Sequence, residues 1–253
     1  MRKNFTCYFY LLICFLTITI QAQTWNTQMV NPGIISGTQQ ITYSDENLPV
    51  IIYKVGYRDL MLSIWDGNSW YSKNIFHVST YDILSSFIVR IDTTFIVGIL
   101  NDRLYILELN RQGNILFQKQ QLGISNTTLF VAEKAVSNKI YIAYTSNILF
   151  YITYDLISHS FGDIVTVDGS LNLLNPSIAI GPNNKIWLSY YDNNGRNLKV
   201  AKSDLNSNWD IYFVDTGGDV GQYSQIWVDN SNVAHVAYYD ATNKKLKHAT
   251  FNP

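Results

Sequence analysis

The stretch that decides the fold is Ile178–Ala201, IAIGPNNKIWLSYYDNNGRNLKVA, which is repeated at Ile226–Ala249, IWVDNSNVAHVAYYDATNKKLKHA. The second copy follows the first by 48 positions (178 to 226), and the two align without a gap. Both carry a Tyr-Tyr-Asp triplet in the middle, a Leu-Lys pair after it and a final Ala. Such self-similarity indicates a supersecondary unit that stacks on copies of itself.

Similar blocks recur along the whole chain. Each block alternates apolar residues, follows a turn containing Asn or Asp, and is rich in β-branched and aromatic residues. The blocks begin at Pro49, Phe95, Ile140, Ile186 and Ala234. Successive starts are 45 to 48 residues apart. A period of 2 indicates strands, and no stretch has the 3.6-residue period of a helix.

Each block has a short strand before it and two after it. The first strands of the last two units are expected at Ile178–Ile180 and Ile226–Val228, and an outer strand is expected at Phe161–Val167. Units of four short strands, about 40 to 50 residues long, are typical of β-propeller blades. We therefore predict an all-β, five-bladed β-propeller with four-stranded blades.

The fifth unit has three strands before Pro253, so its fourth strand must come from elsewhere. Trp25–Val30 resembles the outer strand Trp209–Val214, because both begin with Trp and have Val five residues later. We expect Trp25–Val30 to join the C-terminal blade and to close the ring, so that residues 23–253 form one domain. Closure also removes two sheet edges that would otherwise favour aggregation.

Residues 1–22 are predicted to be a secretory signal peptide. Arg2 and Lys3 precede the short apolar run Tyr8–Ile20, and small and polar residues follow it. The run is short for a transmembrane span of roughly 20 residues. A lipid anchor at Cys14 is less favoured, because apolar sequence continues beyond it. We expect a secreted or periplasmic protein without a membrane span after cleavage.

Composition excludes several classes of function. Both cysteines, Cys7 and Cys14, lie in the predicted leader, so no disulfide, no Cys-based metal site and no cofactor is expected. The formal net charge is −1, and loss of Arg2 and Lys3 makes it more negative by two. Charged residues are 15% of the chain and form no basic stripe, which argues against nucleic-acid binding. We expect a monomer.

The Tyr-Tyr-Asp triplets provide the candidate ligand-binding residues. In a propeller, the turn after the second strand and the loop between blades share one face. Aromatic rings there could stack on a sugar while Asp accepts hydrogen bonds from its hydroxyls; alternatively, the Tyr packs between blades and the Asp caps the turn. The candidate residues are Tyr190, Tyr191, Asp192, Asp219, Tyr223, Tyr238, Tyr239 and Asp240.

The turn Asp66–Trp70, DGNSW, resembles the Asp-box hairpin of sialidase-like propellers, and Ser203–Trp209 is a looser version. Pro176–Ala249 is similar to the secreted bacterial propeller repeats grouped near that superfamily. The resemblance implies the propeller fold. In that family the box is a structural element remote from the active site, so the resemblance assigns no catalytic residue.

The sequence favours binding over catalysis. Outside the predicted leader the glutamates are Glu46, Glu108 and Glu133, and only Glu133 ends an inner strand as a glycosidase acid would. Catalytic residues therefore stay unknown. We predict a secreted non-catalytic binding module whose ligand is a carbohydrate. The alternatives are a propeller-type glycoside hydrolase and an extracellular protein-interaction scaffold.

Overall fold

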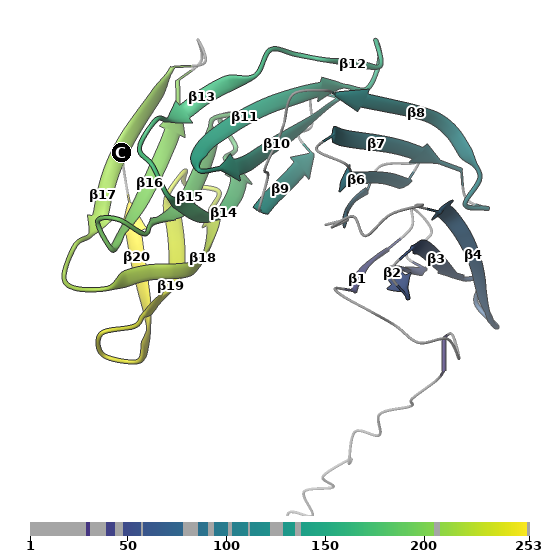
Figure 1. Ribbon diagram of the computed structural model, residues 1–253, viewed down its shortest axis with the longest axis horizontal. Helices are drawn as coiled ribbons and strands as arrows, with labels where there is room; N and C mark the ends of the chain where they lie inside the picture. Colours follow the sequence, from purple (N-terminus) through teal and green to yellow (C-terminus); the bar gives the residue numbers. More distant parts are fainter. Residues whose placement is uncertain are drawn as a thin grey trace, which may run out of the picture.

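The structure is a computed structural model, and every regular element among its described residues is a β-strand (Figure 1). It describes residues 29–30, 39–43, 48–56, 58–77, 86–90, 94–100, 103–110, 112–121, 129–134, 138–204 and 208–251.

The described strands form five antiparallel sheets, each built from strands that are consecutive in the chain (Figure 1). The first sheet is β1 (Gln40–Tyr43), β2 (Pro49–Val55), β3 (Asp59–Trp65) and β4 (Trp70–His77). The second is β5 (Ser86–Arg90), β6 (Thr94–Leu100), β7 (Arg103–Leu109) and β8 (Ile115–Gln121). The third is β9 (Leu129–Lys134), β10 (Lys139–Ser146) and β11 (Ile148–Asp155), with β12 (Ser160–Phe161) and β13 (Val165–Asp168) both paired to β11. The fourth is β14 (Leu173–Ile180), β15 (Ile186–Asp192), β16 (Asn197–Ser203) and β17 (Trp209–Asp215). The fifth is β18 (Val220–Val228), β19 (Ala234–Asp240) and β20 (Lys245–Phe251).

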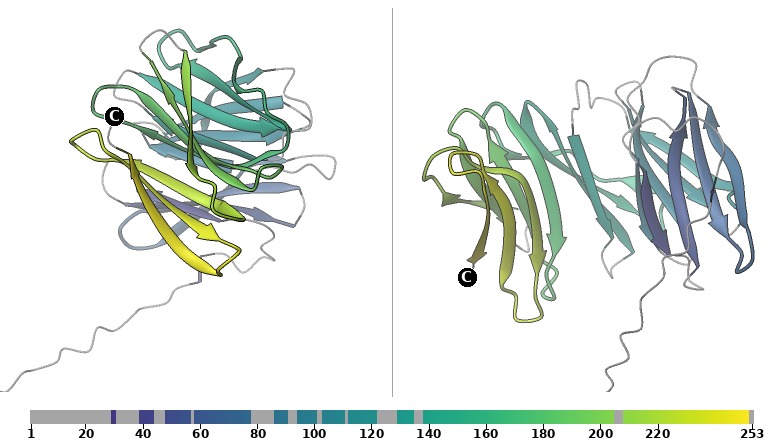
Figure 2. Two further views of the ribbon diagram at one scale, coloured as in Figure 1. Left: turned by 90° about the vertical axis from the view of Figure 1, so that its left-hand side faces the viewer. Right: turned by 90° about the horizontal axis from the view of Figure 1, so that it is seen from below.

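The sheets follow one another around an open arc (Figures 1 and 2). The first strand of each sheet contacts the first strand of the next, in the order β1, β5, β9, β14, β18. The strands that follow the repeated turns are β2, β6, β10, β15 and β19, and each begins within one residue of its predicted start. The all-β prediction is therefore confirmed.

Apolar side chains fill the spaces between neighbouring sheets rather than one central core. Leu62 of the first sheet packs with Leu107 of the second, and Leu188 of the fourth packs with Tyr151 of the third. Every residue of β15 is buried, because sheets cover both faces of the fourth sheet.

Asp and Asn residues shape the hairpins between the third and fourth strands of a sheet. Asp66 Oδ1 accepts hydrogen bonds from the backbone N–H groups of Asn68 (2.8 Å) and Ser69 (2.7 Å). The same capping role falls to Asn110, Asp155 and Asp204. The stretch Asp66–Trp70 is thus a capped turn between β3 and β4, which agrees with the structural role that the Asp-box resemblance implies.

The first strands of the last two sheets are longer than predicted. β14 and β18 begin before Ile178 and Ile226, and each contains a register shift. Asn175 and Tyr223, which occupy equivalent positions in the two shifts, have positive φ values of 53° and 54°. Such a bulge interrupts strict alternation. The alternating pattern therefore predicted only the last three residues of each strand.

The outer strand predicted at Phe161–Val167 is instead divided into β12 and β13. At Gly162, between them, an added Cβ would lie 2.6 Å from Thr153 Oγ1. The chain therefore approaches β11 more closely at this point than a residue with a side chain permits.

Ring closure by Trp25–Val30 is not seen in the described part of the chain. Residues 25–28 lie outside the described residues, as do the predicted signal peptide and Glu46. Val30 lies at the first sheet, where its carbonyl oxygen accepts a 3.5 Å hydrogen bond from Ser72 Oγ of β4. The last sheet has three described strands. The five-blade ring and its closure stay predictions.

Candidate functional site

In the last three sheets, turns lie against the connections between sheets and form a surface called the loop face here. It comprises the turn after the second strand of a sheet and the connection to the next sheet. Asn193 N donates to Asn172 O (3.2 Å), and Ala241 N donates to Asp219 O (2.8 Å). These bonds join turns to connections, as the sequence predicted for the candidate residues.

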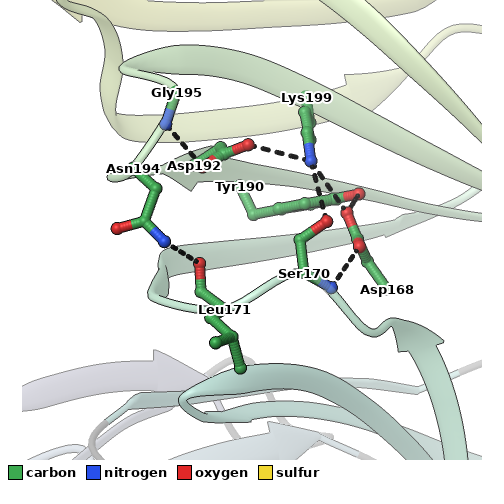
Figure 3. Close-up of polar contacts among 8 residues, drawn as sticks. All are labelled: Asp168, Ser170, Leu171, Tyr190, Asp192, Asn194, Gly195 and Lys199. Carbon is green, nitrogen blue, oxygen red and sulfur yellow. Dashed lines mark hydrogen bonds and ion pairs between the residues drawn. The ribbon is translucent and has the colours of Figure 1, made fainter.

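Four buried polar residues and the half-buried Ser170 form a first intersheet cluster beneath this face; the four are Asp168, Tyr190, Asp192 and Lys199 (Figure 3). Lys199 Nζ lies 2.9 Å from Asp192 Oδ2, 3.3 Å from Asp168 Oδ2 and 3.2 Å from Ser170 Oγ. Tyr190 donates its hydroxyl hydrogen to Asp168 Oδ2 at 2.8 Å. The side chains of Lys199 and Asp168 are only 4% and 5% exposed. The cluster joins the end of β13 in the third sheet to β15 and β16 in the fourth.

Hydrogen bonds and charge pairing keep these carboxylates ionised. Burial raises the pKa of Asp168, but hydrogen bonds from Ser170 and Tyr190 and the charge of Lys199 outweigh it and hold the pKa below its usual range. Burial also raises the pKa of Asp192, but the hydrogen bond from the backbone N–H of Gly195 and the ammonium group of Lys199 outweigh it and lower the pKa. Burial and the bond to Asp168 raise the pKa of Tyr190, so its hydroxyl stays a donor.

A second intersheet cluster repeats this arrangement between the fourth and fifth sheets. It consists of Asp215, Tyr238, Asp240 and Lys247. Tyr238 donates to Asp215 Oδ2 at 2.7 Å, and Lys247 Nζ pairs with the same carboxylate. Lys247 Nζ also lies 3.7 Å from Asp240 Oδ2. Burial and the bond to Asp215 raise the pKa of Tyr238 to about 12.

A third link between sheets uses Tyr191 and Asp219. Tyr191 donates its hydroxyl to Asp219 Oδ1 at 2.7 Å, and Gln222 Nε2 donates to the same oxygen at 3.0 Å. Asp219 N in turn donates to Thr242 Oγ1 at 2.7 Å. Burial and the hydrogen bond from Tyr191 to Asp219 raise the pKa of the Tyr191 hydroxyl. Asp219 therefore connects the fourth sheet to the turn between β19 and β20.

The structure separates the eight candidate residues by exposure. Tyr190, Asp192, Tyr238 and Asp240 are buried in the intersheet clusters, which supports the structural interpretation of these four. Their ligand-binding role stays a prediction, as it does for Tyr191, Asp219 and Tyr239.

Tyr223 differs from the other candidates because 69% of it is exposed. Its backbone has a φ of 54°, which is rare for a bulky residue. Tyr223 follows Gln222, so it lies next to the Asp219 link. On the same loop face, Asn194 Nδ2 donates a hydrogen bond to the backbone carbonyl oxygen of Leu171 at 3.2 Å, and the side chain of Leu171 is exposed (Figure 3).

Sequence reasoning missed five cluster members: Asp168, Ser170, Lys199, Asp215 and Lys247. Both lysines belong to the repeat and are 48 positions apart, whereas the two carboxylates end successive outer strands and are 47 apart. A repeated Asp at the end of each outer strand, matched with a repeated Lys, could have indicated a charge pair between units.

Of the three glutamates considered from the sequence, the structure describes the side chain of Glu108. Glu108 lies 3.8 Å from His159. The side chain of Glu133 lies outside the described residues. In the described ranges no group of three His, Cys, Asp or Glu residues is arranged to hold a metal ion. No helix in these ranges is long and apolar enough to cross a membrane.

No protein-family model matches the chain, and no curated protein matches it. Among solved structures it is similar to the fungal lectin of Aleuria aurantia, described as a six-bladed β-propeller with a fucose recognition mode. The TM-score is 0.56 at 11% identity, over 85% of this chain and 73% of the lectin. The Dos1 propeller matches with a TM-score of 0.52 at 14% identity, over 84% of this chain and 57% of that one. A protein of unknown function from Bacteroides caccae matches with a TM-score of 0.51 at 12% identity, over 82% and 76%.

These likenesses, together with the arc of consecutive antiparallel sheets, show that the chain has a β-propeller type of fold. The chain spans little more than half the length of the Dos1 propeller.

Proposed function

We propose that this protein is a carbohydrate-binding propeller module that binds its ligand on the loop face. The observation that carries the proposal is the exposed ring of Tyr223 on a bulged strand beside the polar turns of that face. An aromatic ring can pack against the apolar side of a sugar, while amides and carboxylates bond to its hydroxyls. The exposed amide of Asn194 offers such a group.

The intersheet clusters favour binding rather than catalysis. Their carboxylates are already paired with Lys199 and Lys247 and bonded to tyrosine hydroxyls. Pairing of this kind lowers a carboxyl pKa and removes the acid form that a glycosidase needs. The fold likeness to a fucose-binding lectin adds support for a sugar ligand.

The test is a glycan array followed by calorimetry on the best ligand. We expect binding that Tyr223→Ala weakens at least tenfold, because the ring supplies the packing surface. The matched control is Tyr71→Ala, since Tyr71 is an exposed tyrosine on β4, away from the loop face. No binding to any glycan would contradict the function, whereas equal losses in both variants would contradict the site.

We also propose that the protein is secreted after removal of residues 1–22. The basic start and the short apolar run support this processing. The mass of the protein recovered from culture medium or periplasm should correspond to a chain that begins at Gln23. Recovery of the intact chain would contradict it.

We further propose that the five sheets are five blades and that Trp25–Val30 supplies a fourth strand to β20. The match with Trp209–Val214 and the three-stranded last sheet support it. Amide hydrogen exchange measures this pairing directly. Deletion of residues 23–30 should accelerate exchange along β20 (Lys245–Phe251), and unchanged exchange there would contradict the strand addition.

A further inference from the structure

Two histidines meet on one side of the last sheet. His235 lies near the start of β19 and His248 lies in β20, and the strand register pairs His235 with Thr250 and Ala237 with His248. Because side chains alternate along a strand, both imidazoles belong to the same side of the sheet. Their rings are nearly parallel, at 9°, and His235 Nδ1 lies 3.2 Å from His248 Nε2. The hairpin thus brings together two ring nitrogens from residues that are 13 positions apart.

Asp229 determines which nitrogen of His235 carries a hydrogen. Its Oδ1 accepts hydrogen bonds from the backbone N–H groups of Ser231 and Val233, both at 2.8 Å, and its Oδ2 lies 3.4 Å from His235 Nε2. The bonds from Val233, His235 and Ser231 hold the pKa of Asp229 below its usual range, so the carboxylate is ionised and only accepts. Nε2 must therefore be the donor, and neutral His235 directs the lone pair of Nδ1 toward His248. A carboxylate orients metal-binding histidines in the same way.

The distance between the two facing nitrogens suits a shared metal ion. Zinc–imidazole bonds are about 2.0–2.1 Å long, so two nitrogens on one tetrahedral ion lie about 3.3 Å apart. In the hydrogen-bonded pair, His248 Nε2 donates to His235 Nδ1. Neutral His248 can instead carry its hydrogen on Nδ1, and both facing nitrogens then have lone pairs. Rotation of the exposed His248 ring directs both at one ion, with no net gain or loss of protons.

The surroundings leave room for the other ligands of an ion and do not repel it. Ala237, the direct partner of His248, is small and exposed, so water reaches this pair. The neighbours on β18, Gln225 and Trp227, carry no charge. The ligands and Asp229 all belong to the last sheet and to the turn between β18 and β19. A strand added at the other edge of β20 extends the sheet in its own plane and leaves the site in place.

We propose that His235 and His248 bind one divalent transition-metal ion, with Asp229 as the residue that orients His235. Imidazole nitrogen is a ligand that Cu²⁺ and Zn²⁺ favour, and Cu²⁺ binds more tightly than Zn²⁺ at a given site. In the described ranges no third His, Cys, Asp or Glu completes the site, so water supplies the remaining ligands. Because its ligands come from two neighbouring strands, the bound ion stabilises the β19–β20 pair. The proposal is independent of the sugar ligand.

Calorimetric titration with CuCl₂ tests the site, in an untagged chain with Cys7→Ser and Cys14→Ser to remove competing thiols. We expect saturable binding of one Cu²⁺ per chain, at least a tenfold loss of affinity in His235→Ala and in His248→Ala, and a higher thermal midpoint with the ion. The matched control is His77→Ala, because His77 is also an exposed histidine beside an aspartate. Circular dichroism verifies that each variant is folded. No saturable binding, or an equal loss in His77→Ala, overturns the proposal.

NMR of the histidine ring nitrogens distinguishes direct binding from an indirect effect of the substitutions. Zn²⁺ should shift Nδ1 of His235 and Nε2 of His248, while Nε2 of His235 keeps its hydrogen. Zn²⁺ shifts confined to other histidines overturn the site.

Asp229→Asn tests the orienting role, because an amide oxygen can still cap the turn but carries no charge. It should weaken Cu²⁺ binding about 10–100-fold and leave the thermal midpoint of the metal-free protein nearly unchanged. Unchanged Cu²⁺ affinity in this variant overturns the role of Asp229.

Discussion

At the scale of single residues, Lys199 stabilises two largely buried carboxylates. Asp168 and Asp192 each lie within 3.3 Å of Lys199 Nζ. Removing one partner of a buried charge pair leaves the other charge uncompensated. Lys199→Met should therefore lower the free energy of unfolding by about 3–5 kcal/mol. Urea denaturation measures it, with Lys119→Met on exposed β8 as the control that should change little.

The same carboxylates determine the response to acid. The folded-state pKa values of Asp168, Asp192 and Asp215 are held below the usual range. Their contribution is therefore complete above the unfolded-state value of about 4 and is lost as the pH falls through the folded-state values. Stability should decline between about pH 5 and pH 2. Asp168→Asn should make that decline shallower, and an unchanged slope would contradict this assignment.

Tyr223 has a left-handed backbone at a bulge where the fourth sheet has Asn175, a residue type that tolerates this conformation better. A left-handed backbone costs a residue other than glycine about 1–2 kcal/mol, and the extra chain entropy of glycine offsets about 0.5–1 kcal/mol of this. Tyr223→Gly should thus stabilise the protein by about 0.5–1 kcal/mol while it weakens sugar binding. Thermal denaturation measures the gain, and Tyr71→Gly, within β4, should instead be destabilising. A loss of stability in Tyr223→Gly would indicate that the ring supports the fold.

At the scale of elements, the approach of β18 to the fourth sheet depends on one glycine. Gly221 has a φ of 103°, and an added Cβ would lie 2.6 Å from the Cα of Leu198. Gly221→Ala should cost about 2–4 kcal/mol, because it combines an unfavourable backbone with a clash against main chain. Gly169→Ala is the control, since nothing lies within 4 Å of its added Cβ. Chemical denaturation measures the free energy of unfolding of both variants, and equal denaturation midpoints would contradict this account of the contact.

Strand periodicity located most elements because the second and third strands of each sheet have regular pleats. It failed where the backbone departs from that pleat. The bulges at Asn175 and Tyr223 interrupt alternation, and Gly162 divides an outer strand into two. Local deviations of this kind depend on what lies across the sheet, which a pattern along the chain does not contain.

At the scale of the whole molecule, a sheet in the middle of the series is covered on both sides by its neighbours, whereas the last sheet has one exposed side. β15 is buried throughout, whereas only alternate residues of its equivalent β19 are buried. The sequence of β19 is nevertheless as apolar at Val236 and Tyr238 as β15 is at Leu188 and Tyr190. Whether the second side of such a strand is buried therefore depends on the presence of a neighbouring sheet and not on the residues of the strand itself.

By itself the sequence determined that the chain is all-β, where the second strands begin and that turns and connections share one face. The first two follow from side-chain alternation and turn chemistry, which act between residues close in the chain, and the third follows from the propeller architecture that the repeat predicted. Only the tertiary structure showed that Tyr190 and Tyr238 reach Asp168 and Asp215 in the preceding sheets. It also showed that Tyr223 stands exposed. Contacts between units depend on how sheets stack in space, and two identical triplets in the sequence do not specify which partner each side chain meets.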